Sequence, residues 1–396
     1  MDLASQHMTL SLRHSLAALV ALVSSCNLYY PQADDPGHVS DAGTPGVDTP
    51  PSDAPPTGPP PSDAPTNACI TKAAAQLADA PPTQPPLVES TPPPLGVLAS
   101  GQDDPRRLVM DRRYLYWVNH GVDVFGNGAI MRIPKTGGDP EVVAANQNVP
   151  EGLVVDDQAI YWTNRGDANG QGQLVCAAKV GGTPRVLVSG LDWPVELVQD
   201  SQYVYWTNWS TSEIWRFPKA GGQRELVATP DGKVMNGIAV DDSQAYVGTE
   251  ATATTTATVV GFAKAGGGAP TVMGPIADSV LAYLAVDDGY VYWTNYIDGS
   301  VRRVAKSGGT PEALFTGVYD LRYMTIVGET VYFAQYSNAG VPRNHPAPGG
   351  IRKVPRMGGP VTTLIEGGNG YWGIAVDDTT VYFTNQQTGT VSAVAR

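Results

Sequence analysis

Short apolar runs alternate with turn-forming residues along most of this chain, and the runs recur at a nearly constant distance. The clearest copy is Val-Tyr-Trp-Thr-Asn at 291–295. Related segments occupy 115–119, 160–164, 204–208, 331–335 and 381–385, with a weaker copy at 245–249. Their central tyrosines are spaced by roughly 40 to 50 residues, a period typical of repeating four-stranded units. The chain is therefore predicted to be built from seven such units.

The rest of each unit repeats as well. An apolar segment that ends in Asp-Asp precedes the aromatic run at 153–157, 237–242, 284–288 and 373–378. A strand-like segment that ends in a basic residue and a glycine pair follows it at 133–138, 177–182, 217–222, 304–309 and 354–359. Because Asp-Asp and Gly-Gly suit tight turns, each unit is predicted to hold four short strands. Seven units of this kind predict an all-β fold, a seven-bladed β-propeller of four-stranded blades.

The paired aromatic residues of the repeat predict how the blades pack. Neighbouring side chains of a strand point to opposite faces of its sheet, so Tyr292 and Trp293 need cover on both faces. A blade between two neighbouring blades provides that cover. We therefore expect these aromatics to form the core between blades.

The two ends of the repeat region are predicted to complete one another. The last unit stops at Arg396, which aligns with the basic residues before the glycine pairs, so this unit lacks its fourth strand. The segment 94–101 resembles the outer strands at 312–317 and 185–190. We expect it to pair into the last blade and close the ring, which removes an unpaired edge.

The Tyr-Trp-Thr-Asn copies and their spacing resemble the YWTD repeats of low-density lipoprotein receptor-type propellers. The resemblance covers about three quarters of the chain. Asparagines 164, 208, 295 and 385 stand where those repeats carry aspartate, and that family has six blades. The resemblance implies a β-propeller that binds proteins, and it supplies no catalytic residues.

The N-terminal residues indicate export. An apolar run from Ser15 to Val23 is too short to span a bilayer and ends in Val-Ser-Ser-Cys at 23–26. This tetrapeptide resembles the lipobox of bacterial lipoproteins, which implies that residues 1–25 are a signal peptide and that Cys26 is lipidated. The expected product is a membrane-anchored protein of the periplasm or cell surface. An ordinary cleaved signal with an incidental cysteine is the alternative.

Two further segments precede the propeller. Residues 26–66 are rich in Pro, Asp, Ser and Thr, so they cannot bury enough apolar surface to fold and are predicted to be a disordered tether. Residues 67–93 form a lead-in with a short predicted helix, and the propeller is expected to span 94–396. Cys69 and Cys176 either form a disulfide or remain free thiols, and both possibilities are open.

Candidate binding residues are expected on the propeller face where the loops after each second strand meet those before each first strand. After the second strands stand His120, Arg165, Trp209, Glu250, Tyr296, Tyr336 and Gln386. The residues just before each first strand add Arg106, Glu151, Glu196, Asn236, Tyr283, Arg322, Tyr323, Tyr371 and Trp372. An insertion in the sixth unit adds Arg343 and His345. Aromatic and Arg side chains are typical of binding surfaces, while capping of the core is the alternative for several of these rings.

The function classes can be narrowed further. No nucleophile elbow, metal-ligand spacing or phosphate-binding loop accompanies the two histidines of the propeller, and no cofactor or metal is predicted. The net charge of −13 argues against nucleic acid as a partner. The first hypothesis is a membrane-anchored binding protein for a protein or glycan. The second is an enzyme resembling streptogramin lyases or metal-dependent lactonase propellers, with its active site in the central funnel.

Overall fold

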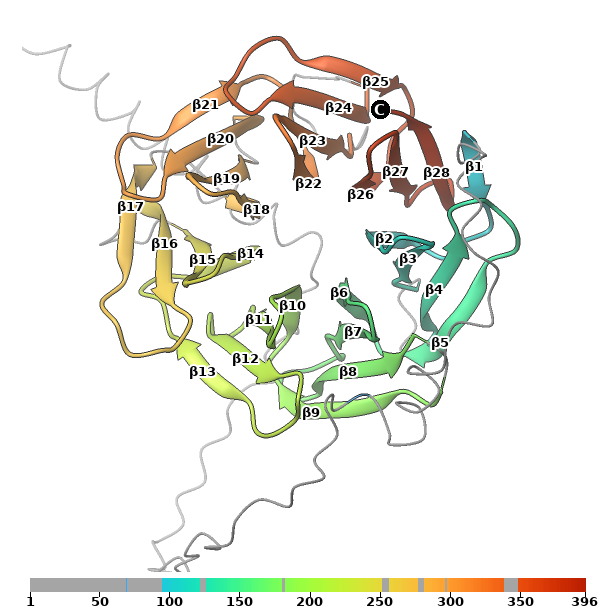
Figure 1. Cartoon of the computed structure of the whole chain (residues 1–396), viewed down its shortest axis with the longest axis horizontal. Coiled ribbons are helices and arrows are strands. Elements are labelled where there is room, and N and C mark those ends of the chain that lie inside the picture. The colour runs from blue at the N-terminus through green and yellow to red at the C-terminus, as the bar shows by residue number, and fades with distance from the viewer. Residues whose placement is uncertain are drawn as a thin grey trace, which may run out of the picture. The chain divides into compact units, whose positions relative to one another are not determined.

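A computed structural model describes residue 69 and residues 95–121, 126–179, 182–250, 256–276, 281–295, 298–337 and 348–396. The predicted signal peptide, Cys26, the tether and all of the lead-in except Cys69 lie outside the described residues. The described part holds seven four-stranded antiparallel sheets, arranged as the blades of a propeller (Figure 1). Within it, no helix is long and apolar enough to cross a membrane. The predicted fold class is confirmed.

The blades are numbered in chain order, and each runs from an innermost to an outermost strand. Blade 1 holds β2 (Pro105–Met110), β3 (Tyr114–Asn119), β4 (Gly128–Pro134) and β5 (Glu141–Gln147), and blade 2 holds β6 (Pro150–Val155), β7 (Ala159–Asn164), β8 (Gly172–Ala178) and β9 (Arg185–Leu191). Blade 3 holds β10 (Pro194–Gln199), β11 (Tyr203–Asn208), β12 (Ile214–Pro218) and β13 (Glu225–Ala228), and blade 4 holds β14 (Val234–Val240), β15 (Gln244–Thr249), β16 (Ala257–Ala263) and β17 (Thr271–Ile276). Blade 5 holds β18 (Leu281–Val286), β19 (Tyr290–Asn295), β20 (Ser300–Ala305) and β21 (Glu312–Phe315), and blade 6 holds β22 (Leu321–Val327), β23 (Thr330–Gln335), β24 (Gly350–Pro355) and β25 (Thr362–Glu366). Blade 7 holds β26 (Tyr371–Val376), β27 (Thr380–Asn385), β28 (Thr390–Ala395) and β1 (Gly96–Ala99).

Blade 7 is built from both ends of the propeller sequence. Strand β1 lies antiparallel to β28, with Gly96 opposite Ala393 and Ala99 opposite Val391 (Figure 1). The predicted closure of the ring by an N-terminal strand is therefore confirmed. It gives the C-terminal strand β28 a hydrogen-bonding partner on its outer side.

The aromatic pairs of the repeat form the core between blades. Tyr292 and Trp293 are both fully buried. Each tryptophan packs toward the preceding blade: Trp206 of blade 3 clusters with Tyr161 of blade 2. The next residue of the repeat also links blades, because the Thr163 hydroxyl accepts the Gly152 N–H at 2.9 Å and donates to the Val195 carbonyl of blade 3 at 3.0 Å. The predicted two-sided packing is confirmed.

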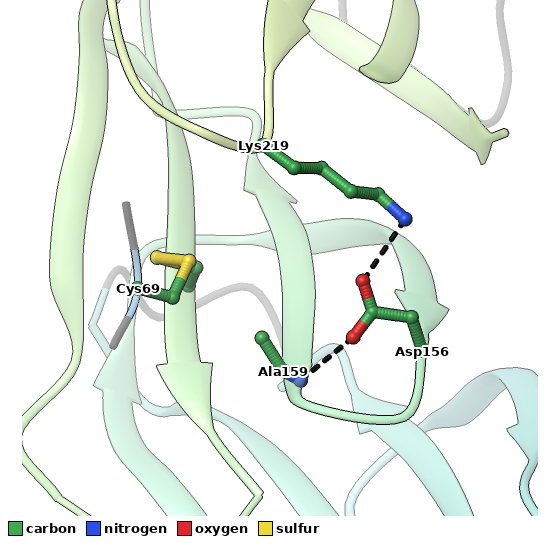
Figure 2. Close-up of a disulfide and its surroundings, with 5 residues drawn as sticks. Cys69, Asp156, Ala159 and Lys219 are labelled. Carbon is green, nitrogen blue, oxygen red and sulfur yellow. Dashed lines mark hydrogen bonds and ion pairs between the residues drawn. A yellow bond between two sulfur atoms is a disulfide. The ribbon is translucent and has the colours of Figure 1, made fainter. Parts of the chain in front are cut away.

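In six of the seven blades, the aspartate that begins the turn between the first and second strands makes two kinds of contact. One oxygen of Asp200 accepts backbone N–H groups of Gln202 and Tyr203 at 2.8 Å, which forms the predicted turn. The other oxygen accepts the Tyr205 hydroxyl at 2.7 Å and pairs with Lys264 of blade 4 at 2.6 Å. Equivalent pairs between adjacent blades are Lys135–Asp377, Lys179–Asp111, Lys219–Asp156 (Figure 2), Lys306–Asp241 and Arg356–Asp287. The basic residues before the glycine pairs therefore link neighbouring blades.

These aspartates should make stability depend on acid. Burial raises the pKa of Asp200, but the hydrogen bonds from Lys264 and Tyr205 outweigh burial and lower the pKa to about 2. Because the pKa is lower in the folded state, ionised Asp200 contributes to stability at pH values above its unfolded pKa of about 3.9. This contribution is lost as the pH falls toward 2. We expect the urea midpoint to fall between pH 4 and pH 2, and Asp200→Asn to flatten this decline.

The exposed second aspartate of the blade 4 turn, Asp242, provides the matched control. Asp242→Asn should leave the acid limb of the stability curve unchanged. If both variants behave alike, the pairs between blades do not set the acid sensitivity.

A disulfide ties the lead-in to blade 2. Cys69 and Cys176 are bonded, with their Cα atoms 5.8 Å apart, and Cys176 lies on β8 within the core between blades 2 and 3 (Figure 2). The two cysteines are 107 residues apart in the sequence, so the bond restricts a long stretch of the unfolded chain. Native disulfides of this kind typically contribute about 2–4 kcal/mol.

Candidate functional site: the central polar network and its rim

A β-bulge in each innermost strand shapes the centre of the ring. In β2, Pro105 lies opposite Asn119 but Leu108 lies opposite Trp117, so three steps along β2 match two along β3. The register shifts at the corresponding place in the innermost strand of every blade. Bulges change the direction of side chains and interrupt the two-residue alternation of a strand. The bulges hold most of the polar residues described below.

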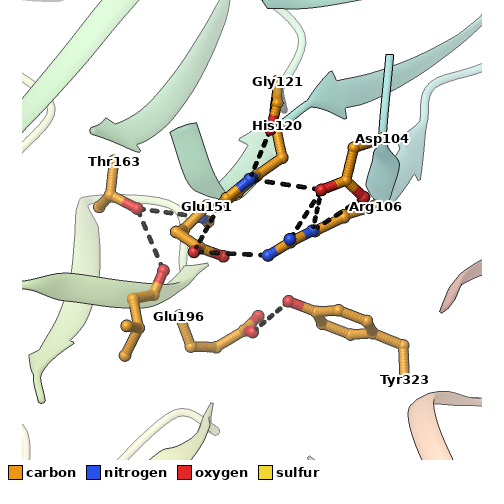
Figure 3. A network of polar contacts seen from close by, with 10 residues as sticks. Asp104, Arg106, His120, Gly121, Glu151, Thr163, Glu196 and Tyr323 are labelled. Atoms are coloured by element: carbon orange, nitrogen blue, oxygen red, sulfur yellow. Dashed lines mark hydrogen bonds and ion pairs between the residues drawn. The ribbon is translucent and has the colours of Figure 1, made fainter. Parts of the chain in front are cut away.

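Three blades are joined by a buried ion pair at the centre. Arg107 of blade 1 pairs with Glu196 of blade 3 at 3.1 Å. The Tyr323 hydroxyl of blade 6 donates to Glu196 at 2.8 Å, as Figure 3 shows. The Arg107 guanidinium lies 4.4 Å from the centre of the Tyr323 ring, and Tyr283 of blade 5 packs on that ring at 4.1 Å. Only 5% of the Glu196 side chain is exposed. Burial raises the pKa of Glu196, although Arg107 and the Tyr323 hydrogen bond oppose it.

A second network lies beside the first at the start of blades 1 and 2. His120 contacts Glu151 through Nε2 at 3.0 Å and Asp104 through Nδ1 at 3.4 Å, and Arg106 bonds to Asp104 at 2.7 Å (Figure 3). Burial and Arg106 lower the pKa of His120, but Glu151 and Asp104 outweigh them and raise it. Burial raises the pKa of Glu151, but His120 and Arg106 lower it to about 2. Two carboxylates thus face two cations, and the network balances its own charge.

This balance bears on metal binding. Within the described residues no group of three or more His, Cys, Asp or Glu side chains is arranged to hold a metal ion. Asp104 and Glu151 already share Arg106 and His120, so their negative charge is compensated by the protein. The residue set therefore fits an ion-paired structural network.

A row of aromatic and cationic side chains crosses the rim over blades 2 to 4. Trp193 and Trp209 stack with ring centres 5.5 Å apart. Arg165 lies 5.2 Å from the Trp193 ring, and Lys233 lies 3.7 Å from the Trp209 ring. All four side chains are partly exposed. We call these four residues the tryptophan row.

A corresponding cluster over blades 6 and 7 is more deeply buried. Tyr336 meets Trp372 edge to face at 5.5 Å, and Arg322 lies 4.6 Å from the Trp372 ring. Arg322 also pairs with Asp320 at 2.8 Å. Tyr336 is 5% and Trp372 6% exposed. These rings therefore cap the inner ends of their blades.

The candidate residues that follow the second strands lie beside the segments that precede the first strands. A repeated backbone hydrogen bond joins the residue after the second strand to the residue before the first strand of the same blade, in the pairs His120–Asp104, Arg165–Val149, Trp209–Trp193, Glu250–Lys233, Tyr336–Asp320 and Gln386–Gly370. Glu250 is partly exposed, and burial raises its pKa against the effect of Lys233. Tyr283, Tyr323 and Tyr371 are 7–8% exposed. Tyr296, Arg343 and His345 lie outside the described residues.

The sequence reasoning missed Asp104, Arg107, Trp193 and Lys233. Arg107 directly follows the candidate residue Arg106, and the bulge lets both contribute to the central networks where strand alternation would allow only one. Asp104 and Trp193 have φ angles of 53° and 54° at the turn before the first strand. Their common position before a proline, Pro105 or Pro194, was a usable sequence signal.

Comparison with family models gave no match, and comparison with curated proteins gave none. Among solved structures, the computationally designed protein Ika8 is similar over 76% of this chain and 98% of its own, with 11% identity and a TM-score of 0.54. The nidogen/laminin complex gives 21% identity, coverage of 54% and 79%, and a TM-score of 0.43. A gluconolactonase from Xanthomonas campestris gives 13% identity, coverage of 76% and 88%, and a TM-score of 0.44. The likeness to Ika8 supports the fold alone.

Proposed function

We propose that this chain is a membrane-anchored, extracytoplasmic binding propeller that holds a protein or glycan on the face formed by the tryptophan row. The observation that carries the proposal is the row itself. It places two partly exposed indoles between two cations on the loops of three adjacent blades. Tryptophan and arginine dominate the energetics of recognition surfaces because they combine large contact areas with directed polar groups.

The centre of the ring favours binding over catalysis. Both ring nitrogens of His120 face carboxylate oxygens, and these carboxylates raise its pKa against the effect of burial. A general base needs a free nitrogen and a pKa near the working pH. Arg107 and Glu196 are likewise satisfied by each other and by Tyr323. These groups are therefore assigned to holding the blades in place beneath the rim.

The binding proposal is tested with the purified full-length chain on a panel of immobilised oligosaccharides and by crosslinking to exported proteins of the producing cell. Trp209→Ala should weaken the captured interaction at least about tenfold, as expected for a recognition hot spot. Trp215→Ala is the matched control, because Trp215 lies on β12 of the same blade and also faces a cation, Arg224, at 4.5 Å. Full binding by Trp209→Ala, or no retained glycan or protein for the unaltered chain, would overturn the proposal.

The anchor is a separate part of the proposal. It is supported by the lipobox-like segment 23–26, which precedes a Pro-rich spacer. Cys26→Ala should move the chain from the detergent phase to the aqueous phase in a phase-partition experiment. Retention of the variant in detergent would contradict lipidation, and this outcome is independent of the result for Trp209.

A further inference from the structure

A cavity of about 850 Å³ lies between blades 3 and 4, away from the central networks. One wall is formed by Val227 and Ala228 at the end of β13. The other wall is formed by Thr258, Val260 and Phe262, which alternate along β16 and therefore share one face of the strand. The cavity thus runs along the strands between two blades.

The cavity lies beside the weakest copy of the repeat, which contributes Thr249 to its lining. At the position that Trp206 occupies on the second strand, blades 1, 2, 3 and 5 have a tryptophan and blades 6 and 7 have a phenylalanine, and Trp206 itself packs against blade 2. In blade 4 this position is Val247, which packs toward blade 3. Its cross-strand neighbour is Val260. The equivalent cross-strand pairs are larger in blades 1, 3 and 5, namely Trp117–Met131, Trp206–Trp215 and Trp293–Arg302.

The lining defines what this space could accept. Valine, alanine and phenylalanine provide six of the fourteen lining residues, and threonines 229, 249, 256 and 258 add hydroxyl groups. The charged lining residue is Asp231, and none of the described lining residues is a lysine or arginine. An anion would therefore enter without a countercharge, at a high cost in desolvation. The volume lies within the range of about 300–1,000 Å³ found for small-molecule sites.

We propose that this cavity, which we call the inter-blade cavity, is a second binding site for an uncharged, largely apolar small molecule that carries a few oxygen atoms. The apolar body would contact Val260 and Phe262. Hydroxyl groups of the ligand would donate to the Thr249 and Thr258 hydroxyl oxygens, whose own protons go to the Thr258 and Gly274 carbonyls. The site shares no residue with the tryptophan row, so it does not depend on the function proposed above. Its ligand would bind between blades rather than on the rim.

The experiment measures binding of the uncharged fluorescent probe N-phenyl-1-naphthylamine to the purified full-length chain. Val247→Trp introduces the residue that blades 1, 2, 3 and 5 have at this position and should fill the cavity from beside Val260, so the affinity should fall at least about tenfold. Phe383→Trp is the matched control, because it introduces the same residue at the same repeat position in blade 7. Phe383→Trp should leave the affinity for the dye unchanged. Any dye bound elsewhere on the chain is the same in all variants and does not affect their comparison.

A second variant covers the case in which Val247→Trp fails to fold. Val260→Met introduces the blade 1 residue at the facing position and narrows the inter-blade cavity with a smaller change. Loss of affinity in either folded variant supports the site. Wild-type affinity in every folded variant overturns it. Equally tight binding of the anionic probe 1-anilinonaphthalene-8-sulfonate to the unaltered chain would overturn the assigned ligand class.

Discussion

Replacing Glu196 by glutamine should lower the free energy of unfolding by about 3–5 kcal/mol, the range for breaking one partner of a buried ion pair. The amide removes the countercharge of Arg107, which the bulge of β2 holds in the centre of the ring. Tyr323 keeps an oxygen acceptor at residue 196, so the loss would report mainly on the unpaired guanidinium. Urea denaturation of the two proteins measures the difference.

Two controls make this expectation specific. Glu225→Gln removes an equivalent partner of Arg216, but 42% of the Glu225 side chain is exposed, so the cost should stay below about 1 kcal/mol. Adding Arg107→Met to Glu196→Gln should recover much of the loss, because no unpaired charge remains. Equal costs for Glu196→Gln and Glu225→Gln would show that the central pair is well hydrated.

Trp293→Ala should cost roughly 3–5 kcal/mol, because it deletes a large side chain that is fully buried between blades 4 and 5. The loss combines the transfer of the indole with the cavity that it leaves against Tyr246 and Leu281. Thermal and urea denaturation would both record it.

The comparison for this variant is Trp209→Ala on the rim, where the indole is partly exposed and a deletion leaves less buried volume. Its cost should be clearly smaller. Comparable losses for the two variants would contradict the assignment of Trp293 to the core between blades.

Most of the fold could be read from the sequence because a propeller is made of local units. Tyr292 and Trp293 show their two-sided burial through simple strand alternation, and the segment 94–101 shows its partner through likeness to other outer strands. The ion pairs between blades could also have been predicted from the sequence. Aspartates and basic residues of opposite charge recur together in the units, and Lys264 and Asp200 are one such pair.

The central networks could not be predicted in the same way. Arg107, Glu196 and Tyr323 come from blades 1, 3 and 6, and only closure of the ring brings them together. The bulge in β2 also brings two adjacent residues into the central networks, which strand alternation does not predict, so Arg107 was missed beside Arg106. The inter-blade cavity could not be predicted from Val247 alone. Its cross-strand neighbour Val260, which lines the cavity, is identified only by the register of β15 and β16.

The position of the disulfide determines how the propeller responds to mechanical force. A pull on the chain before Cys69 reaches the fold through the bond to Cys176, which lies in the third strand of blade 2. The β1–β28 pairing that closes the ring then lies outside the path of this load. Reducing the bond would redirect the same load onto this four-residue strand, which could be peeled from β28. The disulfide therefore diverts a load applied to the N-terminal segment into blade 2 and away from the strand pair that closes the ring.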